Sequence, residues 1–269
     1  MRAPEWIQIG FTVALAIFAW ARPLELRRRW RIALLAGVTV AAIYLARYAF
    51  PARVSSVVRD WLPVALLLCP YWQAGQFFKG ANPRIEQRLG RIDERVLDWM
   101  GRRGLRAAGS WWSDFLELAY LMCYPLVPLG MGVLYFWRQR AAVDFYWVVV
   151  LLASDISFVV TIFVPAMPPR ALVKDLSAEA VRGNVRRLNF AVLNRGSIQA
   201  ITFPSAHVAS TVACGLVLLR YVPAAGMAFL AVGAGVAAGA FVGRYHYFMD
   251  VVAGAVLAAG VFLGCVWLR

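Results

Sequence analysis

The sequence predicts an all-α, polytopic transmembrane helical bundle with about six to eight spans. Hydrophobic residues make up 62% of the 269 residues, well above the roughly 45–50% that soluble domains carry. The mean hydropathy is +0.65. Long apolar runs recur along the chain, and no globular core needs so many. The candidate spans lie near residues 5–21, 32–47, 61–78, 115–137, 145–165, 200–220, 222–243 and 247–268.

Residues 1–78 are expected to form N-terminal membrane spans. Arginines follow the first apolar run, whereas a secretory signal peptide carries its cations before the run. The first run is therefore expected to be a retained helix that starts outside and enters the cytoplasm. The run at 61–78 contains Pro63 and Pro70, so it is either a weak span or a re-entrant segment.

Residues 79–114 form a polar connection with an amphipathic pattern. Apolar residues recur at helical spacing with arginines and acids between them: Ile85, Leu89, Ile92, Val96, Leu97 and Met100. This pattern is typical of a helix that lies on the bilayer surface. A helix packed over the loops of the bundle would show it too, and the two interpretations are compatible.

Residues 115–269 are expected to form a helical core of five spans. One long polar connection, 166–199, interrupts them, and connections of this length inside compact proteins are usually functional. In an alternating bundle, residue 170, residue 207 and the 244–250 segment all fall on the same membrane face. Residues far apart in sequence can therefore meet at one end of the bundle.

The charge and the cysteines exclude other classes of site. The net charge of +14 rests almost wholly on arginine. In a membrane protein such a charge indicates loops that meet anionic lipid, so the bilayer is the expected partner and nucleic acid is not. The four cysteines all lie in apolar runs without metal-ligand spacing, which predicts free thiols.

The chain has only two histidines, and each lies in a short polar string. His246 precedes Asp250 by four residues, which on a helix places both on one face. A carboxylate there can orient the imidazole and stabilise its charged form. The alternative is a helix-capping aspartate beside a hydrogen-bonded interfacial histidine.

Two further strings supply groups that suit an anion. Ser205 offers a hydroxyl and the backbone N–H groups of a helix start, although it is equally an ordinary helix cap. Arg170 follows two prolines at the end of a span, where it can bind phosphate or simply reach the membrane interface. Together with His207, His246 and Asp250, these residues fit phosphoryl transfer through a phosphohistidine. No acidic cluster near the strings suggests a metal, so no metal or other cofactor is expected.

The strings Phe203-Pro204-Ser205-Ala206-His207 and His246-Tyr247-x-x-Asp250 resemble the type-2 phosphatidic acid phosphatase and vanadium haloperoxidase superfamily. They are most similar to a membrane branch that includes the inositol phosphorylceramide synthases, which likewise shows two prolines after a span. The resemblance covers roughly residues 115–268 and implies a phosphatidate-phosphatase-like core.

The resemblance implies a role for each residue. His246 would be the nucleophile, Asp250 its orienting partner, and His207 the general acid that later activates the acceptor. The phosphoryl oxygens would be held by Arg170, Arg244, Ser205 and the Ala206 N–H. Phe163 stands where the broad signature has lysine, and Lys174 would replace that cation by fold-back of its loop. Arg244 also lies two residues before His246, whereas the broad signature places it six before.

The resemblance leaves three functions open. The first is a phosphatase that hydrolyses a phosphorylated lipid, either a phosphomonoester or a diphosphate, and is expected in the plasma membrane. The second is a phosphotransferase that moves a phosphoryl-linked head group to an acceptor hydroxyl. The third is an anionic-lipid binder or transporter without turnover. The positive-inside rule places the site in the cytoplasm, whereas the resemblance suggests the outer face.

One ionisable residue lies inside a predicted span and outside these strings. Asp155 sits within the apolar run 145–165. An ionisable group at such a depth is costly and is often functional. A hydrogen-bonded residue that fixes helix packing is the alternative, so Asp155 is not assigned to the catalytic set.

Overall fold

The computed structural model describes residues 1–103, 110–172, 184–198 and 200–268. In these residues all regular secondary structure is helical, which confirms the predicted class. Five helices are long and apolar enough to cross a membrane: α1 (Ala3–Ala21), α2 (Leu26–Tyr48), α8 (Val143–Thr161), α12 (Pro223–Val242) and α13 (Phe248–Trp267). Several apolar helices of this length make the chain a membrane protein.

Two of the predicted runs are broken helices. α6 (Ser110–Leu121) and α7 (Cys123–Phe136) are bent by 56°, and they count as a sixth span only if taken together. α3 (Ala52–Leu66) and α4 (Leu68–Gln76) meet at Leu67 within the run that contains the two prolines. Proline lacks the N–H of a helical hydrogen bond, which is consistent with a break in such a run.

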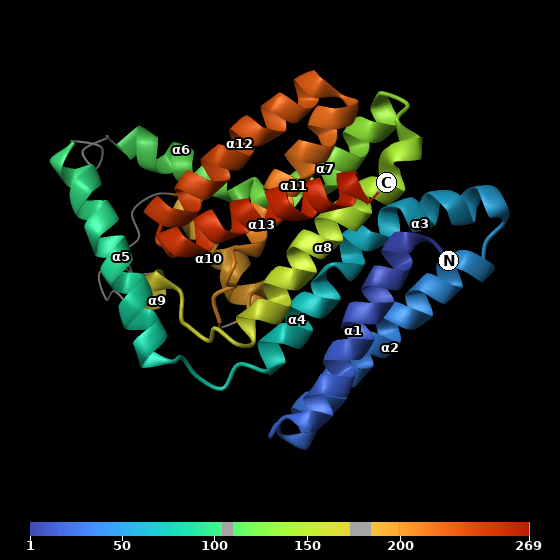
Figure 1. The fold of residues 1–269 in the computed structure, drawn as a ribbon, viewed down its shortest axis with the longest axis horizontal. Coiled ribbons are helices and arrows are strands. Elements are labelled where there is room, and N and C mark those ends of the chain that lie inside the picture. The colour runs from blue at the N-terminus through green and yellow to red at the C-terminus, as the bar shows by residue number, and fades with distance from the viewer. Residues whose placement is uncertain (104–109, 173–183, 199, 269) are drawn as a thin grey trace.

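The core forms around α8 and α11 (Ala206–Tyr221). α11 packs against α7, α8, α12 and α13, and Figure 1 shows it behind α13 in the middle of the bundle. The largest apolar cluster lies where these helices meet and includes Trp147, Val150 and Cys214. α11 itself is a shorter apolar helix, and it begins only at Ala206 because Ser205 caps its first turn.

An ionic network closes one end of the bundle. Asp60 on α3 accepts hydrogen bonds from Arg2, Tyr135 and Arg140, the last at 2.7 Å from Nε to Oδ2. Trp147 Nε1 donates to the Asp60 backbone oxygen at 2.7 Å. These bonds join α1, α3, α7 and α8, and both chain termini lie at this end in Figure 1.

α5 (Pro83–Arg102) lies outside the bundle along the left edge of Figure 1. Its apolar face packs on connecting segments, where Leu89 clusters with Ala166, Ile201 and Tyr247. The outward face is rich in exposed arginines: Arg84, Arg88, Arg91, Arg95 and Arg102. The helix therefore covers the loops of the bundle with one face and leaves a basic face free for anionic lipid.

Candidate active site

The turn between α12 and α13 fixes His246. The N–H groups of Tyr245 and His246 both donate to the Ala240 carbonyl, each at 2.9 Å. Arg244 has a φ of 63° in the left-handed region, and its carbonyl accepts the N–H of Arg170 at 2.9 Å. The backbone thus ties Arg170 directly to the turn that carries His246.

His207 lies in the first turn of α11, which is held closely against the start of α13. The Ser205 N–H donates to the Asp250 carbonyl at 2.9 Å. A Cβ added at Gly254 would lie 2.6 Å from the Ser205 carbonyl oxygen, so only glycine permits this approach. The contact brings His207 beside His246, as the sequence predicted for strings on one membrane face.

The two imidazole rings are 5.8 Å apart between centroids and nearly perpendicular. His246 Nδ1 lies 3.4 Å from Asp250 Oδ2 without forming a hydrogen bond to it, and Nδ1 has no other hydrogen-bond partner among the described residues. Asp250 Oδ2 accepts the Tyr247 N–H at 3.0 Å. Catalytic hydrogen bonds are often long before substrate binds and shorten afterwards, so the pair remains suited to the orienting role.

Burial determines the charge of His246. Its side chain is only 6% exposed, and burial together with the positive charge of Arg170 lowers its pKa from 6.5 to about 3. Both effects disfavour the imidazolium form. At neutral pH His246 is therefore uncharged and carries the lone pair that a nucleophile needs.

Arg170 is the cation that the structure places beside the histidines. It lines a small cavity together with His207 and His246. Its Nη1 donates to the Tyr245 carbonyl at 3.4 Å, and its guanidinium carbon lies 5.4 Å from the centre of the Tyr245 ring. That ring stacks on Tyr120 at 4.0 Å. The guanidinium is thus held over an aromatic face, and no carboxylate among the described residues pairs with it.

Arg244 does not take the place expected from the resemblance. Its Nη1 donates to Asp93 Oδ2 on α5 at 3.1 Å, and it is not among the residues that line the cavity. Asp93 is fully buried, and its Oδ1 also accepts the Phe248 N–H at 2.8 Å. In this structure the Arg244 guanidinium joins the turn that carries His246 to α5, and its expected role in holding phosphate oxygens stays a prediction.

Two other groups expected to bind phosphate form hydrogen bonds within the protein instead. Ser205 Oγ accepts the Val208 N–H at 3.4 Å, as in an ordinary helix cap. The Ala206 N–H donates to Thr202 Oγ1 at 3.3 Å. Both groups are buried, so neither is free for an anion in this state. Lys174 lies outside the described residues.

Sequence reasoning missed Asp93 and Glu117. Glu117 on α6 is 4% exposed. Its carboxylate accepts hydrogen bonds from Arg186 Nη1 at 2.8 Å, from Asn189 Nδ2 at 2.7 Å and from the Tyr245 hydroxyl. It therefore joins α6, α10 (Asn184–Gly196) and the turn that carries His246. The sequence could have indicated both residues. Asp93 lies beside the apolar positions of an amphipathic helix and Glu117 lies in an apolar run, and a carboxylate in such a place needs a partner.

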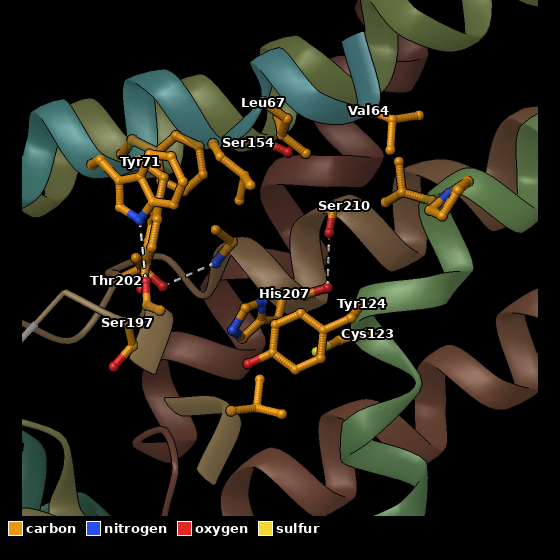
Figure 2. A pocket seen from close by; sticks show the side chains of 18 residues that line it. Val64, Leu67, Tyr71, Cys123, Tyr124, Ser154, Ser197, Thr202, His207 and Ser210 are labelled. Atoms are coloured by element: carbon orange, nitrogen blue, oxygen red, sulfur yellow. Dashed lines mark hydrogen bonds between the residues drawn. The ribbon is translucent and has the colours of Figure 1, made fainter. Parts of the chain in front are cut away.

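Two cavities meet at His207. The cavity with both histidines has a volume of about 30 Å³, enough for one or two water molecules. A larger and mainly apolar pocket of about 340 Å³ reaches His207 from the side of α4, α7 and α8. Figure 2 shows His207 beside Tyr124 in this larger pocket, with Tyr71 and Thr202 along the wall. Tyr71, Ser197, Thr202 and His207 line both cavities.

Asp155 and Phe163 line neither of the two cavities at the histidines. Asp155 on α8 is fully buried, and neither of its carboxylate oxygens has a hydrogen-bond partner among the described residues. Phe163 is 57% exposed and lines a groove beside α1. Within the described part of the chain, no three His, Cys, Asp or Glu side chains are grouped so that they could hold a metal ion.

Comparison with known proteins gave one match. A family model described as the PAP2 superfamily matches residues 87–264, which is more than half of the chain and includes both histidine strings. A search of curated proteins found no match. A search of solved structures found none either.

Proposed function

This chain belongs to the PAP2 superfamily, and from that membership we propose that it is a membrane-embedded lipid phosphate phosphatase that works through a phosphohistidine. Membership supports an enzyme of the phosphatase or phosphotransferase type that acts on lipid phosphates. The observation that carries the proposal is the placement of His207, His246 and Arg170 around one cavity at the end of an apolar pocket. We also propose the plasma membrane as its location.

The proposed reaction has two steps. Nε2 of neutral His246 attacks phosphorus, and a bond from nitrogen to phosphorus forms. The bond to the leaving oxygen breaks as the imidazolium form of His207, which the negative charge of the bound phosphate favours, delivers a proton to that oxygen. His207 then removes a proton from water, whose oxygen attacks phosphorus and releases His246. Arg170 stabilises the charge on the equatorial oxygens, and Asp250 orients the His246 ring.

The apolar pocket supports a lipid substrate. Its 340 Å³ are lined by side chains from α3, α4, α7, α8 and α11, including Leu67, Val127 and Phe158. An acyl or prenyl chain there would place its phosphate next to His207. Because the cavity at the histidines holds only about 30 Å³, its walls must move apart to admit a phosphoryl group.

One observation favours the phosphotransferase alternative. His246 is 4% exposed, and its cavity is small, so a phosphohistidine there would be shielded from bulk water. Such shielding gives an acceptor hydroxyl time to compete with water, as in an enzyme similar to the inositol phosphorylceramide synthases. Product analysis with and without an added polyol separates the two: a new phosphodiester identifies transfer, and free phosphate identifies hydrolysis.

The proposed function is tested by phosphate release from phosphatidate and polyprenyl phosphates. Purified protein in detergent with a metal chelator should release phosphate. His246→Ala should lower kcat/KM by about 10³-fold or more, and His207→Ala by about 10²- to 10⁴-fold. Arg220→Gln, an exposed change at the far end of α11, is the matched control and should leave the rate unchanged.

Two results would contradict the proposal. Equal activity of the parent and the His246→Ala variant would show that His246 is not the nucleophile. If the protein binds these lipids but neither releases phosphate nor transfers a group to a polyol, it is instead a binder or transporter. Equal melting temperatures of parent and variants establish that the rates compare folded proteins.

A further inference from the structure

A second pair of hollows lies beside α1, the end of α8 and the segment that follows α4. It consists of two adjoining hollows, a polar one of about 320 Å³ and an apolar groove of about 540 Å³. Ile162, just after the end of α8, lines both. Neither hollow shares a lining residue with the cavities at the histidines.

The polar hollow carries two available cations. Arg22 follows the candidate span α1, and Lys79 follows the short helix α4. Both are exposed, and among the described residues neither forms an ion pair. The Lys79 ammonium donates to the Pro23 carbonyl, which leaves two of its three donors free. The Arg22 guanidinium carbon lies 5.3 Å from the centre of the Phe18 ring.

The apolar groove adjoins the hollow that contains these cations, since Ile162 lines both. Side chains of α1 form one wall, from Phe18 back to Trp6, and Val159, Ile162 and Phe163 form the other. Twelve residues of helix span about 18 Å, close to the roughly 15 Å depth of one leaflet of the hydrocarbon core. The groove therefore matches the length of one lipid tail.

We propose that this composite site binds an anionic phospholipid, with its phosphate between Arg22 and Lys79 and one acyl chain along the groove of α1. Charge complementarity favours this occupant, because two unpaired cations at the interface attract a phosphate that the bilayer itself supplies. A second copy of the chain would leave both cations unpaired unless it brought acids to them. The site is separate from the proposed catalytic cavity, so the proposal stands independently of the enzymatic activity.

The test measures lipid binding to the purified full chain by native mass spectrometry in detergent. The probes are dioleoyl phosphatidylglycerol, dioleoyl phosphatidylcholine and inorganic phosphate. The parent should retain phosphatidylglycerol about tenfold more tightly than phosphatidylcholine, and R22Q/K79Q should lose that preference. R53Q/R220Q removes two exposed cations at the other end of the bundle and should behave like the parent.

The tail position has its own variant. A Cβ at Gly10 meets no atom within 4 Å, so Gly10→Leu fills the groove without disturbing the fold. It should weaken phosphatidylglycerol binding without lowering the melting temperature measured in the absence of lipid. The proposal is overturned if R22Q/K79Q keeps the parent's preference, or if inorganic phosphate stabilises the protein as much as the lipid does. It is also overturned if Gly10→Leu leaves phosphatidylglycerol binding unchanged but converts a dimer to a monomer, because the groove would then bind a second copy of the chain.

Discussion

At the scale of single residues, the uncharged state of His246 determines what the site can do. Burial and Arg170 both disfavour the imidazolium form, so the nucleophile keeps its lone pair. Asp250 lies close enough to orient the ring once substrate tightens the site. In the proposed mechanism Arg170, which lines the cavity, supplies the positive charge for the phosphoryl oxygens, whereas Arg244 is paired with Asp93 in this structure.

The lowered pKa of His246 predicts the acid limb of the pH profile. Protonation removes the lone pair, so activity is lost as the pH falls through the pKa of His246 in the free enzyme. With a pKa of about 3 instead of 6.5, protonation of His246 should cause no loss of kcat/KM between pH 7 and pH 5, and a loss only below that range. The ionisation of the phosphatidate substrate is titrated separately in the same detergent and corrected for, because it lies near this range. An acid limb centred near pH 6.5 would show that His246 is not the buried neutral base described here.

At the scale of elements, the junction of α11 and α13 sets the distance between the two histidines. The Ser205 N–H bonds the Asp250 carbonyl, and Gly254 lets the helix backbone approach the Ser205 carbonyl. On the opposite side, Asp93 holds the start of α13 to α5. Glu117 holds the preceding turn to α6 and α10. The site is therefore built from elements that are distant in sequence.

Gly254→Ala should damage activity more than alanine at either of the other two glycines of α13, Gly260 and Gly264. The new Cβ would lie 2.6 Å from a backbone oxygen, so α11 and α13 must separate and the histidines with them. Activity should fall at least tenfold, and the melting temperature should also drop. Gly260→Ala is the matched control, because its Cβ meets open space and alanine favours a helix by about 0.5–1 kcal/mol. Equal activities of the two variants would mean that this close contact does not position the site.

At the scale of the whole molecule, the two ends of the bundle differ in charge and in role. The histidine end carries exposed arginines of α5, of the connection after α1 and of the first turn of α2, among them Arg84, Arg22 and Arg27. The opposite end carries the Asp60 network and fewer exposed arginines, such as Arg53 and Arg220. The positive-inside rule then favours the cytoplasm for the histidine end.

This orientation is tested by cysteine labelling in intact cells. A membrane-impermeant maleimide should label Arg53→Cys without permeabilisation and Arg84→Cys only after it. The parent is the background control, since three of its four cysteines are buried. The reverse pattern would place the histidines on the outer face.

The sequence alone predicts the spans and the pairing of the histidines, because both depend on local pattern. Hydropathy locates α1, α2, α8, α12 and α13, and the His246–Asp250 spacing needs only one helix start. The predicted run at 145–165 ends early, at Thr161, because prolines follow it. The orientation of the Arg244 side chain was not predictable, because it is set by a hydrogen bond to Asp93, which lies 151 residues earlier in the chain.

Isolation of the phosphoenzyme tests the central claim most directly. A phosphatidate or polyprenyl phosphate with a ³²P-labelled phosphoryl group is mixed with the protein and quenched within milliseconds. The account predicts a label that is lost in acid, survives base, maps to His246 and is absent from His246→Ala. A label on a serine or carboxylate, or a fully active His246→Ala variant, would contradict it.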